Sequence, residues 1–175
     1  MALVPDPSSP LHALMTTHRA PGRVEWIGVR EARRGTVRAL DRATIGMNGL
    51  AGDHRARPGK RAMTLIQFEH LPVIAALAGG EGTLAPERLR RNIVVSGINL
   101  LALRDGEIRV GTAVLRAAGI CAPCSRMTEE FGPGGYNAVR GHGGLIGEVI
   151  EPGEVALGDA VSPIGIVAGV AAAPR

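Results

Sequence analysis

The two cysteines of this 175-residue chain, Cys121 and Cys124, are the side chains best suited to chemistry, and they form a Cys-Ala-Pro-Cys motif. A basic turn at residues 87–92, Glu-Arg-Leu-Arg-Arg-Asn, lies upstream and leads into an apolar run. Guanidinium groups bind anions, and a thiolate is a nucleophile or a soft metal ligand. Residues 86–127 therefore predict an anion site beside a reactive thiol.

A Cys-x-x-Cys pair has three interpretations: half of a zinc site, a dithiol redox centre, or one functional cysteine beside a second that takes no part in the chemistry. A closed zinc site needs four ligands, and none of the five histidines has a partner at ligand spacing. A thioredoxin-type dithiol needs a βαβ context, whereas this motif follows a predicted hairpin and precedes only a short helix. We therefore favour a single thiolate that binds a soft metal or carries sulfur.

Cys124 is the better candidate for that thiolate. It directly precedes Ser125, which we expect to cap a short helix at residues 126–131, and Arg126 lies close by. A helix N-terminus and positive neighbours both favour a thiolate. Free cysteine is otherwise among the most buried residue types, so we expect Cys121 in the core or behind the working thiol.

Composition narrows the class of ligand. The net charge is +4 and is carried by arginine, with Lys60 as the single lysine, which favours bidentate contacts to phosphate or carboxylate. Two Phe, one Tyr and one Trp are few for a surface that stacks bases, so we expect a small anionic molecule and no nucleic acid. No apolar run approaches a membrane span and no signal peptide is visible, so we expect a cytoplasmic protein without membrane contact.

The hydrophobic pattern predicts many short strands and few helices. Strands are expected at residues 24–29, 36–44, 62–67, 93–95, 107–110, 113–118, 145–150, 155–157 and 160–164, and the strand at 145–150 is expected to pair with that at 155–157. Short helices are expected at residues 68–77, 85–89 and 126–131. This pattern favours a mainly β fold, a small barrel or sandwich, over a βαβ sheet. Residues 1–22 and 165–175 are expected to be tails.

Four short motifs occur in a characteristic order. They are Arg-x-Asn-hydrophobic-Val-x-x-Gly at residues 90–97, Val-Gly at 110–111, Cys-x-x-Cys at 121–124 and Gly-Asp at 158–159. Together they resemble the MOSC domain, the C-terminal domain of molybdenum cofactor sulfurases, which also occurs alone in bacteria and in the mitochondrial amidoxime-reducing component. The resemblance covers about residues 24–164, and we assign residues 23–164 to one such domain.

The resemblance implies a barrel-like MOSC fold, related to the pyruvate kinase barrel, and a site for the molybdenum cofactor, a phosphorylated pterin of the molybdopterin type. Cys124 aligns with the family's characteristic cysteine, which holds molybdenum in the amidoxime-reducing members. Arg90 and Asn92 match positions that contact the cofactor; a guanidinium can grip phosphate and an amide can read a pterin edge. The additional domains of the sulfurases and of the amidoxime-reducing members are absent from this sequence.

Two loops are expected to line the mouth of the same pocket. Residues 52–61 contribute His54, Lys60 and Arg61, and residues 141–144 contribute His142. Their glycines permit close backbone approach, and the cationic groups suit an anionic cofactor.

Two functions fit this pattern. The favoured one is an enzyme, a molybdenum-dependent oxidoreductase that reduces small N-oxygenated or N-hydroxylated compounds and takes electrons from a separate electron-transfer protein. The alternative is a sulfur carrier that bears a persulfide on Cys124, supplied by a cysteine desulfurase, for cofactor or metal–sulfur centre assembly.

Overall fold

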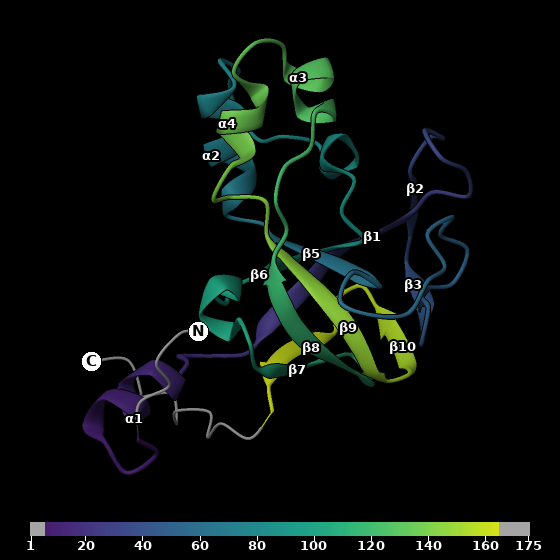
Figure 1. The fold of residues 1–175 in the computed structure, drawn as a ribbon. Helices are drawn as coiled ribbons and strands as arrows, with labels where there is room; N and C mark the ends of the chain where they lie inside the picture. The colour runs from purple at the N-terminus through teal and green to yellow at the C-terminus, as the bar shows by residue number, and fades with distance from the viewer. Residues whose placement is uncertain (1–5, 165–175) are drawn as a thin grey trace.

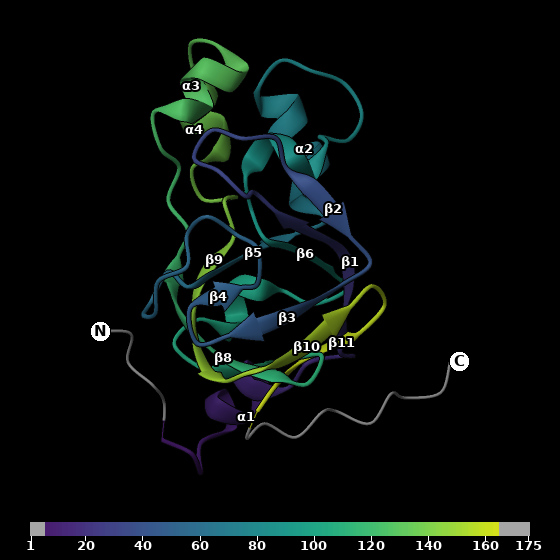
Figure 2. The ribbon, with the colours of Figure 1, turned by 90° about the vertical axis from the view of Figure 1, so that its right-hand side faces the viewer.

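A closed barrel of seven strands forms the body of the chain in the computed structural model, which describes residues 6–164. The barrel order is β11-β7-β8-β9-β5-β6-β1, and β1 closes it by pairing Gly22 with Val161 of β11 (Figures 1 and 2). All neighbouring pairs are antiparallel except β5 and β6. The prediction of a mainly β, barrel-like fold is confirmed.

The strands are short, and several barrel strands, such as β6 and β9, are buried over three consecutive residues. Their bounds are Gly22–Val29 (β1), Arg38–Leu40 (β2), Arg42–Gly46 (β3), Gly49–Leu50 (β4), Met63–Gln67 (β5), Ile93–Ser96 (β6), Glu107–Val110 (β7), Ala113–Ile120 (β8), Leu145–Glu151 (β9), Gly153–Ala156 (β10) and Ala160–Pro163 (β11). Beyond the barrel, β2 pairs with the end of β1, and β10, β3 and β4 form a small second sheet.

Six helical segments connect these strands in the described chain. They are α1 (Pro10–Thr16), α2 (His70–Leu77), α3 (Arg126–Phe131), α4 (Gly135–Val139) and two 3-10 helices, η1 (Pro86–Leu89) and η2 (Leu100–Leu103). Figures 1 and 2 show α2, α3 and α4 together as a cap at one end of the barrel, with α1 at the other end. Within residues 6–164, no helix is long and apolar enough to span a membrane.

Two apolar cores hold these layers together. The larger core fills the barrel and is built from aliphatic side chains such as Ile27, Leu65 and Leu115. The smaller core lies under the cap, where Leu71 and Ile74 of α2 pack with Met127 of α3. The cap is thus fixed on the barrel by its own apolar contacts, and burying each such side chain contributes about 1.5–3 kcal/mol.

Two predicted strand arrangements were wrong. The segment at residues 36–44 is two strands, because the chain leaves the barrel sheet at Asp41 and enters the small sheet. The strand predicted at 155–157 is part of β10, which pairs with β3 rather than with β9. Only Pro152 separates β9 from β10, and this is shorter than the two-residue loop of a tight hairpin.

The helices also depart from expectation in three places. Ser125 precedes α3, but its side chain makes no capping hydrogen bond. A helix that the sequence did not predict, α4, begins at Gly135 in the glycine-rich segment after α3. Residues 10–16 of the predicted tail form α1, whose start is marked by Ser9 accepting a hydrogen bond from the His12 amide. The predicted tail at 165–175 lies outside the described residues.

Candidate anion and thiol site

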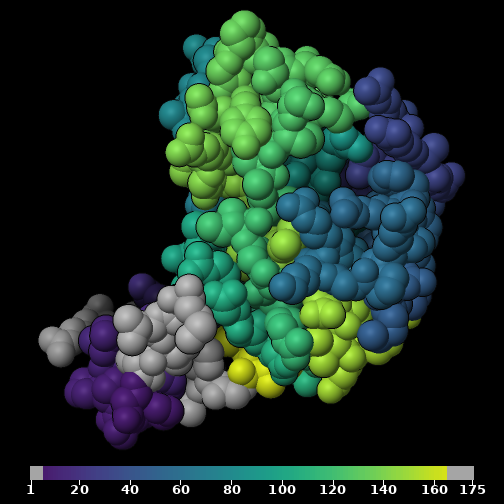
Figure 3. Space-filling model, viewed as in Figure 1, coloured from purple at the N-terminus to yellow at the C-terminus, as the bar shows by residue number. Residues whose placement is uncertain are grey.

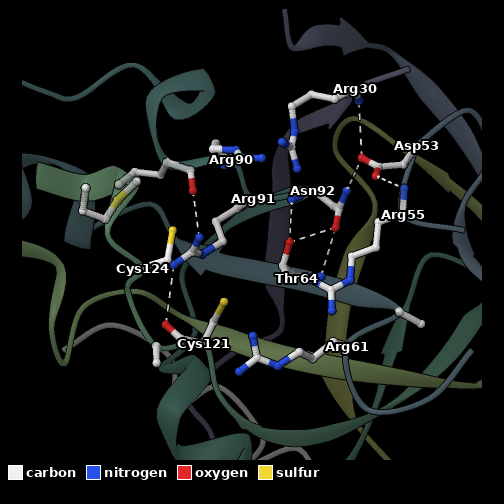
Figure 4. A pocket seen from close by; sticks show the side chains of 14 residues that line it. Arg30, Asp53, Arg55, Arg61, Thr64, Arg90, Arg91, Asn92, Cys121 and Cys124 are labelled. Atoms are coloured by element: carbon white, nitrogen blue, oxygen red, sulfur yellow. Dashed lines mark hydrogen bonds between the residues drawn. The ribbon is translucent and has the colours of Figure 1, made fainter. Parts of the chain in front are cut away.

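A cavity of about 180 Å³ lies where the helical cap meets the barrel. Segments far apart in the sequence line it: the end of β1, the loop between β4 and β5, the junction of η1 and β6, the Cys-Ala-Pro-Cys segment after β8, and α3 (Figure 4). On the face seen in Figure 3 the surface is hollowed between the green cap and the blue loop. The closed barrel therefore brings the predicted basic turn and the predicted thiol to one place.

The lining of this cavity is strongly cationic. Asp53 is its single carboxylate, whereas five arginines line it: Arg30, Arg55, Arg61, Arg90 and Arg91. Among the described residues, no side-chain salt bridge neutralises any of the five. Such a concentration of unpaired guanidinium groups favours an anionic ligand.

Burial and neighbouring arginines lower the pKa values of two of these residues, Arg30 and Arg90. Burial lowers the pKa of Arg30, and Arg126, Arg55 and Arg91 lower it further, against the opposing charge of Asp53. Burial also lowers the pKa of Arg90; Arg30 and Arg126 add to this, while Cys124 acts in the opposite direction.

The Nη1 atom of Arg30 is buried and has no hydrogen-bond partner in the structure. A buried donor without an acceptor is costly. An anion in the cavity would supply one.

Asp53 is held in place by donors from several elements. Its side chain is only 7% exposed and lies 3.1 Å from Nδ1 of His54. It accepts hydrogen bonds from the backbone amides of Arg30 (3.3 Å) and Arg55 (2.9 Å) and from Nδ2 of Asn92 (3.2 Å). The carboxylate therefore ties the loop between β4 and β5 to β1 and β6.

The side-chain amide of Asn92 forms its hydrogen bonds with other residues of the protein. Its Oδ1 accepts hydrogen bonds from the amide (3.2 Å) and hydroxyl (2.8 Å) of Thr64, and its Nδ2 donates to Gly28 O (3.4 Å) as well as to Asp53. An amide has two donor hydrogens and two acceptor lone pairs, so all four are used. In this arrangement Asn92 positions the cavity wall, and its contact with a pterin edge stays a prediction.

Arg91 is the buried member of the cluster, at 8% exposure. Its guanidinium donates to three backbone carbonyls: Gly143 O (2.7 Å), Leu89 O (2.7 Å) and Cys121 O (3.5 Å). The amide of Cys121 in turn donates to Gly144 O at 2.8 Å. Arg91 therefore holds the Cys-Ala-Pro-Cys segment against the loop at residues 141–144, as Figure 4 shows for its contact with Cys121.

The two cysteines differ as the sequence predicts. Both are free thiols and both line the cavity, but Cys121 is buried and Cys124 is exposed. An exposed thiol beside cationic groups is the kind of cysteine that reacts or binds metal. Among the described residues, no group of three or more His, Cys, Asp and Glu side chains is arranged to hold a metal ion.

The structure brings together four of the seven predicted site residues and leaves three outside the cavity lining. Arg61, Arg90, Asn92 and Cys124 line the cavity. The other three do not: His54 contacts Asp53, Lys60 is exposed, and the His142 ring packs edge-on against His70 of α2 with 5.0 Å between ring centroids. The loop at residues 141–144 lies behind Arg91 rather than at the mouth of the cavity.

The sequence did not single out several residues that complete the lining, among them Arg30, Asp53, Arg55 and Thr64. Arg55 falls in the cationic loop that the sequence did indicate. Arg30 and Thr64 carry no local signal, because each lies at or beside a strand and joins the cavity only through barrel closure.

Sequence and structure comparisons agree with this architecture. The MOSC domain family matches residues 41–162. The chain belongs to the MOSC domain family. No curated protein matches it.

Among solved structures, the YuaD protein of Bacillus subtilis superposes with a TM-score of 0.71 at 19% identity, covering 81% of this chain and 94% of that one. YiiM of Escherichia coli (TM-score 0.61, 19% identity, 85% and 72% covered) and YiiM of Geobacillus stearothermophilus (0.67, 16%, 82% and 75%) share the fold.

Proposed function

We propose that this MOSC protein binds a molybdenum cofactor through its arginine-lined cavity and holds the metal with Cys124. The observation that carries this proposal is the exposed Cys124 thiol on the same cavity as five arginines. The buried and unpartnered Nη1 atom of Arg30 supports it, because a phosphorylated ligand would supply the missing acceptor. The association of the family with this cofactor agrees with the chemistry of the donor set.

Under this proposal the arginines of the cavity have two roles. Arg30, Arg61 and Arg90 bind the phosphate, since guanidinium groups form short charge-assisted hydrogen bonds to phosphate oxygens. Arg91 fixes the segment that carries Cys124. His54, Lys60 and His142, which do not line the cavity, stay predictions as contacts to ligand or substrate.

We propose further that the loaded protein is the reductase component for small N-oxygenated or N-hydroxylated compounds. When bound, the cofactor would supply two-electron oxygen-atom transfer. The protein binds and orients the substrate next to Cys124, and Leu89 and Met127 contribute apolar wall to the cavity. A separate electron-transfer protein supplies the electrons, and basic groups at the cavity would steer an acidic donor toward it.

The test is to purify the protein from a molybdenum-replete host, measure its molybdenum and pterin content, and assay it with benzamidoxime and reduced viologen. We expect cofactor-dependent release of benzamidine. A fully loaded protein that left benzamidoxime unchanged, yet accepted radiolabelled sulfur on Cys124 from a cysteine desulfurase and passed it on, would instead establish the sulfur-carrier alternative.

A further inference from the structure

A second cavity, of about 270 Å³, adjoins the first. The two share three lining residues, Arg30, Arg90 and Met127, so that the two arginines form a common wall. The second cavity continues from this wall to the segment before β2 and along α3. A ligand that spans both cavities would pass the side chains of Arg30 and Arg90.

Cationic groups also dominate this second cavity. Two arginines line it without lining the first and have little competing charge: Arg34 forms no salt bridge in the described chain, and Arg126 contacts Glu129 only at 3.9 Å. Arg88, by contrast, is taken by Glu130 at 2.6 Å. Glu87 is the one further carboxylate in the lining. Beside the shared wall, whose Arg30 and Arg90 also face the proposed cofactor phosphate, Arg34 and Arg126 remain available to a second anion.

The backbone conformation of two lining residues independently supports a ligand site in this cavity. Arg34 (φ 67°) and Arg90 (φ 58°) both adopt the left-handed conformation, as does only one other non-glycine residue in the described chain, Asp105. This conformation is unfavourable for a residue with a side chain, and such strain clusters at ligand sites. Here it occurs at two residues that line the same cavity, from two separate loops.

We propose that the second cavity is an anion subsite that binds a carboxylate, or a similar anionic group, of the substrate. The N-oxygenated end of that substrate then lies in the first cavity beside Cys124. The inference rests on the proposed reductase function for the identity of the reacting group, whereas the anion subsite itself rests on Arg34 and Arg126 and on the backbone conformation at Arg34 and Arg90. It predicts that the protein prefers anionic substrates over neutral ones of the same shape.

The test compares two matched compounds, neutral benzamidoxime and 4-carboxybenzamidoxime. Their dissociation constants are measured by calorimetry on the protein as purified, so that no turnover is needed, and KM is measured in the viologen assay. We expect the wild type to bind the carboxylated compound at least about tenfold more tightly, the effect of one charge-assisted contact. Arg34→Gln and Arg126→Gln should each reduce that preference about tenfold by the same reasoning.

Arg33→Gln is the matched control, because Arg33 is exposed, carries the same charge and lines neither cavity. It should leave the preference unchanged. If Arg33→Gln and Arg34→Gln lowered the preference for the carboxylated compound equally, the preference would come from general surface charge. That result would overturn the proposal. So would a loss of pterin content in Arg34→Gln without a change in preference, because the cavity would then hold the cofactor phosphate.

Failure of the reductase function gives a different result. If neither compound were reduced, but the carboxylated compound still bound in an Arg34-dependent way, the anion subsite would stand and the proposed reaction would not.

Discussion

At the scale of single residues, Arg90 is notable because it lies between the two cavities. Its side chain lines both, and its backbone is left-handed. Arg90→Ala removes a charge-assisted contact without opening the core, so we expect cofactor affinity to fall by about 1.5–3 kcal/mol. The melting temperature should stay close to that of the wild type.

Cofactor titration of the apoprotein measures this loss, with Arg57→Ala as the control because Arg57 is exposed in the neighbouring loop and does not line the cavity. Unchanged affinity in Arg90→Ala, at unchanged stability, would show Arg90 to be an ordinary surface arginine.

Asn92 should behave in the opposite way. Asn92→Ala leaves the Asp53 carboxylate and the Thr64 amide each short of a partner, and an unsatisfied buried group costs about 1–3 kcal/mol. We therefore expect a lower free energy of unfolding in urea, with cofactor affinity reduced only as far as the cavity wall is disturbed. A mutant of normal stability that lost the cofactor would instead restore the direct contact that the sequence implied.

The sequence predicts chemistry at this scale better than geometry. Position and neighbours distinguished Cys124 from Cys121, because Cys124 precedes a predicted helix beside Arg126, and the basic turn at residues 87–92 pointed to Arg90. The sequence did not indicate that the Asn92 amide also braces the cavity wall. That role depends on Thr64 and Asp53, which reach Asn92 only in the folded barrel.

At the scale of elements, the loop at residues 141–144 is fixed from both sides. Gly144 has φ 81°, and a Cβ at this position would meet the Leu65 carbonyl and lie 2.8 Å from the Ile66 Cα. Gly141 is also left-handed, at φ 88°, but a Cβ there would meet nothing. The two glycines are therefore a matched pair for separating backbone strain from steric contact.

We expect Gly141→Ala to cost about 1–2 kcal/mol, the price of the left-handed backbone. Gly144→Ala should cost that amount plus about 1–3 kcal/mol for forcing β5 and the loop apart. Urea unfolding of both variants measures the difference. Equal losses would show that the loop moves freely and does not support Arg91 and Cys121.

The positions of most strands were predictable, because segments such as β5, β6, β7 and β8 have clear apolar patterns in the sequence. Strand pairing was not, because it depends on where the chain turns. The division at Asp41 is marked only by one polar residue in the alternating run of residues 37–45, yet it sends β2 and β3 to different sheets. The start of α4 at Gly135 was hidden by glycines that normally end a helix.

At the scale of the whole molecule, stability should depend on pH through the contact between α2 and the loop at residues 141–144. Burial lowers the pKa of His70 below its ordinary value of 6.5, and the charge of His142 lowers it further, against smaller opposing effects from a backbone hydrogen bond with His142 and from the charge of Glu69. The unfolded chain then binds more protons than the folded chain as pH falls below 6.5. The free energy of unfolding should therefore decrease in that range and recover at higher pH.

Urea unfolding between about pH 5 and pH 8, a range that spans ordinary histidine titration, measures this dependence. His70→Gln should flatten the part of the curve near pH 6, since glutamine does not titrate. A curve of the same shape in wild type and variant would assign the dependence to other groups.

We propose that Cys124 by itself, and not the Cys-x-x-Cys pair, holds the metal of a cofactor bound in the arginine-lined cavity. The most direct measurement is the molybdenum and pterin content of wild type, Cys124→Ser and Cys121→Ser, each purified from the same molybdenum-replete host. We predict near-stoichiometric molybdenum and pterin in the wild type and most of both in Cys121→Ser, with molybdenum lost from Cys124→Ser. Equal losses in the two variants, or full retention in Cys124→Ser, would contradict this account.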